Sequence, residues 1–144
     1  MTLPIATRGL RHVALRVRNL VRSKTFYVEL FGMQPVWEPD AQNAYLSSGC
    51  DNLALHEVAA DQLPPVPAPR MGAPSTQALD HIGFIVSTPE AVWAAAEMLR
   101  VRHVPILQEP RRHRDGSCSV YCADPDGNVV QILFEPSISP LSVR

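Results

Sequence analysis

The sequence has few cysteines, almost no net charge and no long apolar run. Its 144 residues include three cysteines (Cys50, Cys118 and Cys122) without a Cys-x-x-Cys pair, so we expect reduced packing thiols and no disulfide framework. A formal net charge of −1 provides no bulk attraction for nucleic acid or an anionic membrane. No stretch approaches the roughly 20 apolar residues that a membrane helix needs. The first residues lack the charged start and apolar stretch of a signal peptide, so we expect a cytoplasmic protein.

Proline, in contrast, is abundant and unevenly placed. There are 14 prolines, about twice the usual frequency, and five of them fall in LPPVPAPRMGAPS at 63–75. This segment has no hydrophobic period and is typical of an extended linker. It separates two halves of similar size, which predicts a first module at 9–60, a linker at 61–78, a second module at 79–136 and a tail at 137–144.

The two halves repeat a short pattern. RHVALRV at 11–17 aligns with DHIGFIV at 80–86, 69 residues later. Both stretches alternate apolar and other residues, which predicts half-buried strands. Each places a histidine, His12 or His81, on the face opposite its apolar residues.

Each of these strands precedes a helix and then three further strands. Asn19 is expected to cap a helix that Gly32 ends, and Thr88-Pro89-Glu90 is expected to begin the second helix. The sequence therefore predicts an α+β fold of two βαβββ modules, each a curved four-stranded sheet with one helix outside, together forming an open cleft. The remaining strands are predicted at 33–37, 44–48, 52–58, 103–107, 117–123 and 128–135, with a hairpin turn at 124–127.

The repeated histidines favour a divalent metal site. If the modules pack about a pseudo-twofold axis, His12 and His81 face a shared cavity, and neutral imidazole suits iron, manganese, zinc and nickel. A histidine on a strand can also be purely structural. His56, predicted on the cavity face of the first module, is a fourth ligand, a pocket acid or base, or a pocket-lining residue.

An oxygen donor is expected from the last strand. Val130, Ile132 and Phe134 should pack under the second helix, which leaves Gln131 and Glu135 on the cavity face. These two residues are about 13 Å apart at strand rise. They therefore cannot replace one another at a single metal.

These features carry a family resemblance. The doubled unit, with RHVALRV, DHIGFIV and SVYCADPDGNVVQILFEP, resembles the vicinal oxygen chelate superfamily over roughly residues 9–136. That superfamily includes glyoxalase I, extradiol dioxygenases, fosfomycin-resistance enzymes and bleomycin-binding proteins. The resemblance implies the glyoxalase/bleomycin resistance/dioxygenase fold, and its single-chain members commonly form homodimers.

Within that superfamily, residues 113–131 are similar to the extradiol dioxygenase signature. The resemblance implies that His113 and Tyr121 assist catalysis and that Gln131 stands where the family has an iron-binding glutamate. A neutral amide leaves a net charge of +2 on Fe²⁺ with two imidazoles, instead of +1, and is a weaker donor. Arg111 is a second departure, because the family favours a small or β-branched residue there. Tyr121 can also be a core aromatic, and His113 an exposed loop residue. The surrounding Arg111, Arg112 and Arg114 can steer an anionic substrate or form a solvated turn, and we favour the solvated turn.

The resemblance implies a metal-dependent enzyme that acts on a small substrate with vicinal oxygens, most like an extradiol dioxygenase. The metal would be Fe or Mn, with Zn or Ni as alternatives, held by His12, His81 and Gln131. A glyoxalase-like lyase or isomerase is the second interpretation, and a metal-free protein that sequesters a small molecule is the third. In each case the expected partner is a small molecule, not nucleic acid or a membrane.

Overall fold

A computed structural model describes residues 5–66 and 78–140 of the chain. The chain forms two compact units, with the boundary between Leu63 and Pro64, and each unit is described by itself below. Residues 67–77 of the predicted linker and 141–144 of the predicted tail lie outside the described residues. None of the helices in the described ranges is long and apolar enough to cross a membrane.

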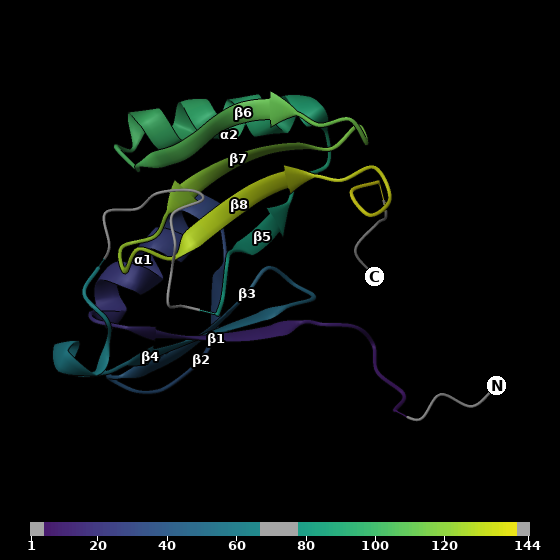
Figure 1. Cartoon of the computed structure of the whole chain (residues 1–144). Helices are drawn as coiled ribbons and strands as arrows, with labels where there is room; N and C mark the ends of the chain where they lie inside the picture. Colours follow the sequence, from purple (N-terminus) through teal and green to yellow (C-terminus); the bar gives the residue numbers. More distant parts are fainter. Residues whose placement is uncertain (1–4, 67–77, 141–144) are drawn as a thin grey trace. The chain divides into compact units, whose positions relative to one another are not determined.

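Unit 1 is a four-stranded sheet with one helix (Figure 1). Its sheet order is β1-β4-β3-β2, with β1 parallel to β4 and the other neighbours antiparallel. A short 3₁₀ helix, Ala60–Gln62, follows the sheet at the start of the predicted linker. The elements are β1 (His12–Val17), α1 (Leu20–Phe31), β2 (Gln34–Asp40), β3 (Asn43–Ser47) and β4 (Asn52–Glu57).

Unit 2 repeats the same topology. Its sheet order is β5-β8-β7-β6, and β5 is parallel to β8 as β1 is to β4. The predicted α+β fold of two βαβββ modules is therefore confirmed. The elements are β5 (Ile82–Ile85), α2 (Pro89–Val101), β6 (Ile106–Arg112), β7 (Cys118–Ala123) and β8 (Val129–Phe134).

Both helices begin at the predicted caps. The Asn19 side chain accepts a hydrogen bond of 2.8 Å from the backbone N–H of Arg22, and the Thr88 hydroxyl accepts one of 3.3 Å from Ala91. Each cap satisfies a backbone donor that the first helical turn leaves unpaired. Gly32 ends α1 at φ +68°, the left-handed conformation that glycine adopts without a steric penalty.

Two strand predictions are wrong at their ends. β2 continues to Asp40, and β6 occupies Ile106–Arg112 where 103–107 was predicted. The residues after α2 are used to end the helix: His103 lies at φ +55°, and Val104 donates a backbone hydrogen bond of 2.9 Å to Leu99. The strand therefore starts later than predicted, at Ile106, and it continues to Arg112. Arg111 and Arg112 thus belong to β6 and not to a solvated turn.

The core of each unit lies between its helix and one face of its sheet. In unit 2, α2 runs along the face formed by β6, β7 and β8 (Figure 1), and Leu99 is fully buried there. Burial of such a side chain stabilises the fold by about 1.5–3 kcal/mol. The buried residues of this layer are Val92, Ala96, Leu99, Cys118, Val120, Cys122, Val130 and Ile132.

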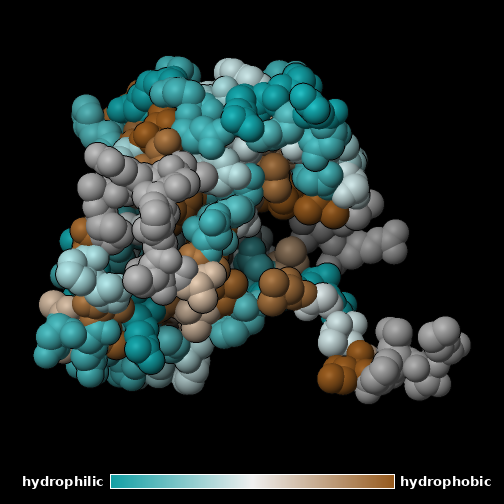
Figure 2. All heavy atoms as spheres, viewed as in Figure 1, coloured by the Kyte–Doolittle hydropathy of each residue, from teal (hydrophilic) through white to brown (hydrophobic). Residues whose placement is uncertain are grey.

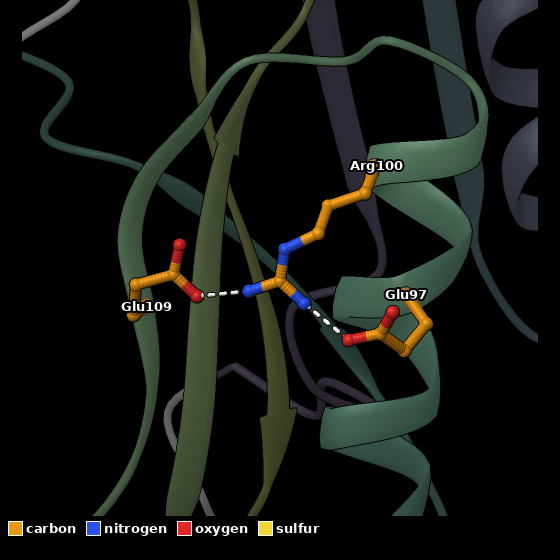
Figure 3. A network of polar contacts seen from close by, with 3 residues as sticks. All are labelled: Glu97, Arg100 and Glu109. Carbon is orange, nitrogen blue, oxygen red and sulfur yellow. Dashed lines mark hydrogen bonds and ion pairs between the residues drawn. The ribbon is translucent and has the colours of Figure 1, made fainter.

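Ion pairs also connect α2 to the edge strand. Arg100 pairs with Glu97 on its own helix and with Glu109 of β6 (Figure 3). Because these side chains are largely exposed, such pairs contribute about 0–1 kcal/mol each. Packing, and not charge, therefore holds the helix on the sheet. Elsewhere, the face in Figure 2 is mostly hydrophilic with scattered apolar patches, as is usual for a folded domain.

Candidate functional site

The face of the unit 2 sheet opposite α2 carries polar side chains. Residues alternate along a strand, so Ser119 and Tyr121 of β7 point away from the helix that covers Val120. Gln131 of β8 is paired with Tyr121 on one side and with Gly83 of β5 on the other. Tyr121, Gln131 and Gly83 therefore lie side by side on three adjacent strands, at the sheet face that α2 does not cover.

The Gln131 side chain is held in one orientation. Its amide nitrogen donates a hydrogen bond of 2.8 Å to the hydroxyl of Tyr121, and the residue is only 9% exposed. Its oxygen, Oε1, lies on the β5 side, 3.5 Å from where a Cβ on Gly83 would be. Because the nitrogen is used by Tyr121, the amide presents its oxygen, which is the atom that binds metals or accepts protons.

His81 lies directly before β5, on the same face. Its ring packs edge-on against Tyr121, with ring centroids 5.4 Å apart and planes at 90°. Its Nδ1 is 2.6 Å from a carboxylate oxygen of Asp80. A carboxylate at Nδ1 favours the Nδ1–H tautomer and leaves the Nε2 lone pair for a ligand. The structure thus brings together His81, Tyr121 and Gln131.

His113 follows β6 and is attached to the same face. Its Nε2 is 3.0 Å from the hydroxyl of Ser119, a fully buried residue two positions before Tyr121. Its backbone N–H donates a hydrogen bond of 2.8 Å to Ser117. His113 is therefore half-buried against the sheet, unlike the exposed loop residue that the alternative interpretation described.

Glu135 takes part in a different interaction. Its carboxylate accepts hydrogen bonds from the backbone N–H of Ser137, at 2.9 Å, and from the Ser137 hydroxyl. Its carboxylate is thus engaged in the turn that follows β8. Gln131 is then the side-chain oxygen donor that β8 offers on this face. Across residues 5–66 and 78–140, no three histidine, cysteine, aspartate or glutamate side chains are grouped as a metal site.

Unit 1 has the same arrangement with one donor fewer. Val13 pairs with Leu53 as Ile82 pairs with Val130, so Ala54 is the counterpart of Gln131. Ala54 pairs with Tyr45, which is therefore the counterpart of Tyr121. The first module provides an aromatic hydroxyl at this level but no oxygen donor on β4.

His12 and His56 lie on this face of unit 1. Nδ1 of His12 is 2.8 Å from the side-chain oxygen of Asn52. Nδ1 of His56 is 2.6 Å from the side-chain oxygen of Asn43. An amide oxygen only accepts, so both rings carry their proton on Nδ1 and keep the Nε2 lone pair.

The amide of Asn43 is anchored in turn. Its nitrogen donates to both carboxylate oxygens of Asp40, at 2.8 and 3.0 Å. The backbone N–H of Gln42 also donates to Asp40, and these hydrogen bonds lower the pKa of the Asp40 carboxyl. Asp40, Asn43 and His56 therefore form a continuous hydrogen-bonded chain.

Sequence reasoning missed the partners of the three histidines. Asp80 precedes His81 in the chain and was visible. Asn52 becomes a neighbour of His12, and Asn43 a neighbour of His56, only through strand register. All three imidazoles have Nδ1 bound to an oxygen acceptor, the pattern in which a second group orients a metal-binding histidine. Within unit 2, the imidazole of His81 and the oxygen of Gln131 are donors of the kind that divalent Fe, Mn, Zn and Ni accept.

Comparison with known proteins agrees with this architecture. A model of the Glyoxalase/Bleomycin resistance protein/Dioxygenase superfamily matches residues 9–132. The chain belongs to this superfamily.

Solved structures of the same fold cover nearly the whole chain. A lactoylglutathione lyase from Agrobacterium tumefaciens has a TM-score of 0.70 and 24% identity, with 92% of this chain and 97% of that chain covered. A glyoxalase/dioxygenase from Nostoc punctiforme has a TM-score of 0.73 and 23% identity, with 94% and 97% covered. At these sequence identities the similarity shows a shared fold alone.

Proposed function

We propose that the protein is a metal-dependent enzyme that acts on a small substrate carrying two neighbouring oxygen atoms. His12, His81 and Gln131 are the proposed ligands. The observation that carries the proposal is the orientation of these donors: Asn52 and Asp80 hold the Nδ1 atoms of the two histidines, and Tyr121 holds the amide of Gln131. Such second groups fix the ring or amide so that its free atom meets the metal.

The metal would supply Lewis acidity to the two neighbouring oxygens of the substrate. Tyr121 would orient the substrate: its hydroxyl accepts a hydrogen bond from Gln131, so its own proton is free to be donated to a substrate oxygen. His113 would accept a proton from the substrate and return it, while the Ser119 hydroxyl, 3.0 Å from its Nε2, would hold the ring in place. Both residues approach from the face that carries His81 and Gln131.

Extradiol cleavage of a catechol-type ring is the reaction that we propose first. The support is that His113 and Tyr121, the two residues that resemble the assisting pair of that signature, share one face of unit 2. A proton-transfer residue and a hydroxyl that orients the substrate are needed together in such a reaction.

A glyoxalase-like lyase or isomerase is the second candidate, and the neutral side chain of Gln131 favours it. An amide ligand leaves one more positive charge on the metal than a carboxylate does. With Gln131 as a ligand, a bound metal would supply stronger Lewis acidity to the substrate oxygens and would be a weaker electron donor to O₂. A neutral ligand at residue 131 therefore favours a proton-transfer reaction, which needs no O₂, over ring cleavage.

Three measurements separate these functions. Oxygen uptake with a panel of catechols by the metal-loaded, untagged protein supports ring cleavage. Turnover of a hemithioacetal without oxygen supports the lyase. Absence of metal uptake together with tight binding of a small molecule would leave the third interpretation, a metal-free binding protein. A homodimer and a cytoplasmic location are proposed alongside, and sedimentation of the purified chain tests the dimer.

A further inference from the structure

We propose that His56 is an acid–base residue of this enzyme, with Asn43 and Asp40 as its positioning residues. The inference rests on the proposed function, and it assigns His56 to the substrate instead of to the metal. The O–H bond of a substrate hydroxyl breaks, its proton moves to Nε2 of His56, and the electron pair stays on the substrate oxygen. The substrate class is a small molecule whose acidic hydroxyl is attached to an aromatic ring.

The hydrogen-bonded chain behind His56 is built to receive a proton. Asn43 accepts from Nδ1 of His56 at 2.6 Å, and its amide nitrogen donates to both oxygens of Asp40. Nε2 is therefore unprotonated in the neutral ring. When Nε2 gains a proton, the positive ring faces an amide oxygen that is polarised by a carboxylate.

The place of His56 on β4 differs from the place that Gln131 has on β8. Its counterpart in unit 2 is Leu133, because Ala54 is the counterpart of Gln131. His56 is two residues beyond Ala54 on β4, about 7 Å along the strand. His56 is therefore not at the β4 position that corresponds to the proposed ligand Gln131.

The surroundings of His56 suit a ring-bearing hydroxyl. Tyr45 packs edge-on against the imidazole, with centroids 5.7 Å apart, and Trp37 packs on Tyr45 at 4.9 Å. Trp37 is 59% exposed, so its ring is accessible to a further aromatic group. The charged groups around His56 are Arg16, its register partner on β1, and Asp40 behind Asn43. Arg16 favours the ionised form of a substrate hydroxyl.

The first test measures how Asn43 positions His56, and it needs neither metal nor turnover. In ¹⁵N-labelled full chain, we expect the NMR signals of His56 to show the Nδ1–H tautomer, the reverse of the preference of free histidine. Asn43→Ala should move His56 toward the Nε2–H tautomer. Asn52→Ala, the matched change behind His12, should leave His56 unaltered. An unchanged His56 tautomer in Asn43→Ala would overturn the positioning role.

The second test reports proton acceptance. 4-Nitrocatechol changes its absorption spectrum when it ionises, and we expect metal-free full-chain protein to bind it in the ionised form at a pH below the pKa of the free probe. His56→Gln should bind the probe in its protonated form. No ionisation in the unsubstituted protein, or equal ionisation in His56→Gln, would overturn the acid–base role.

Measurements of metal content distinguish a failure of this inference from a failure of the proposed function. His56→Gln should keep the metal content of the unsubstituted protein while lowering kcat/KM about 100-fold or more, and the acid limb of its pH profile should disappear. A loss of metal in His56→Gln would make it a ligand and overturn the inference. If the unsubstituted protein takes up no metal, the proposed function fails, whereas the tautomer and the probe still decide the role of His56.

Discussion

Gln131 and Tyr121 face each other across β8 and β7, and the amide nitrogen of Gln131 donates a 2.8 Å hydrogen bond to the Tyr121 hydroxyl. This single contact determines which atom of the amide is presented to a ligand. A glutamine without it presents nitrogen or oxygen with little preference, and only the oxygen binds a metal ion. Tyr121 therefore compensates in part for the missing carboxylate.

Gln131→Glu should bind metal more tightly. The carboxylate is a stronger donor than the amide, and it removes one unit of net positive charge from the site. The Tyr121 hydroxyl can donate to the carboxylate, so the orientation is kept. Titration calorimetry with Fe²⁺, Mn²⁺ and Zn²⁺ measures the change. Equal affinities of the glutamate and glutamine forms would place residue 131 outside the ligand set.

Tyr121→Phe should weaken metal binding about 10- to 100-fold, the usual cost of removing a residue that orients a ligand. The phenyl ring keeps the edge-on contact with His81, so the loss is confined to the hydroxyl. Tyr45→Phe is the matched control, because Tyr45 has the equivalent place in unit 1 but faces Ala54. Equal metal affinities of the Tyr121→Phe and Tyr45→Phe variants would contradict the orienting role of the Tyr121 hydroxyl.

The thiols should differ in reactivity because only one is accessible. Burial, with the nearby charge of Asp124, raises the pKa of Cys122 to about 12, so its thiol stays protonated and unreactive at neutral pH. Cys118 is also fully buried, whereas Cys50 is half-buried. We expect one fast-reacting thiol with a disulfide reagent at pH 8 and three after unfolding. Fast labelling that persists in Cys50→Ser would contradict this assignment.

Leu99→Ala should destabilise the protein by about 2–5 kcal/mol, the range for a truncated core leucine. Leu99 is fully buried between α2 and its sheet, whereas Met98, its neighbour on α2, is 48% exposed. Met98→Ala should change the free energy of unfolding by no more than about 0.5 kcal/mol. Urea unfolding of both variants measures the difference, and similar midpoints would disagree with the described core.

The fold was predictable because its signals are local. Asn19, Gly32 and Thr88 mark the helix ends through cap chemistry that acts within one turn. The repeated alternation around His12 and His81 gave the duplication and the faces of the strands. β6 was misplaced because its start depends on how α2 ends at His103 and Val104, and the sequence pattern does not show that.

The candidate site was predictable only in part. Its histidines and Gln131 were visible as residue types on one strand face. The partners that orient them were not, because Asn43 reaches His56 and Asn52 reaches His12 only through strand pairing. The absence of a donor at Ala54 likewise emerged from register, since the sequence drew attention to His56 two residues later.

The most direct test of the central claim is the metal content of the untagged full-length chain, by elemental analysis and by calorimetric titration of the metal-free protein. We predict stoichiometric uptake of one divalent ion that is lost in His12→Ala and in His81→Ala. It should be retained in His103→Asn, which changes a histidine in a left-handed conformation that asparagine tolerates. Absence of uptake by the unsubstituted chain, or full uptake by either alanine variant, would contradict the account.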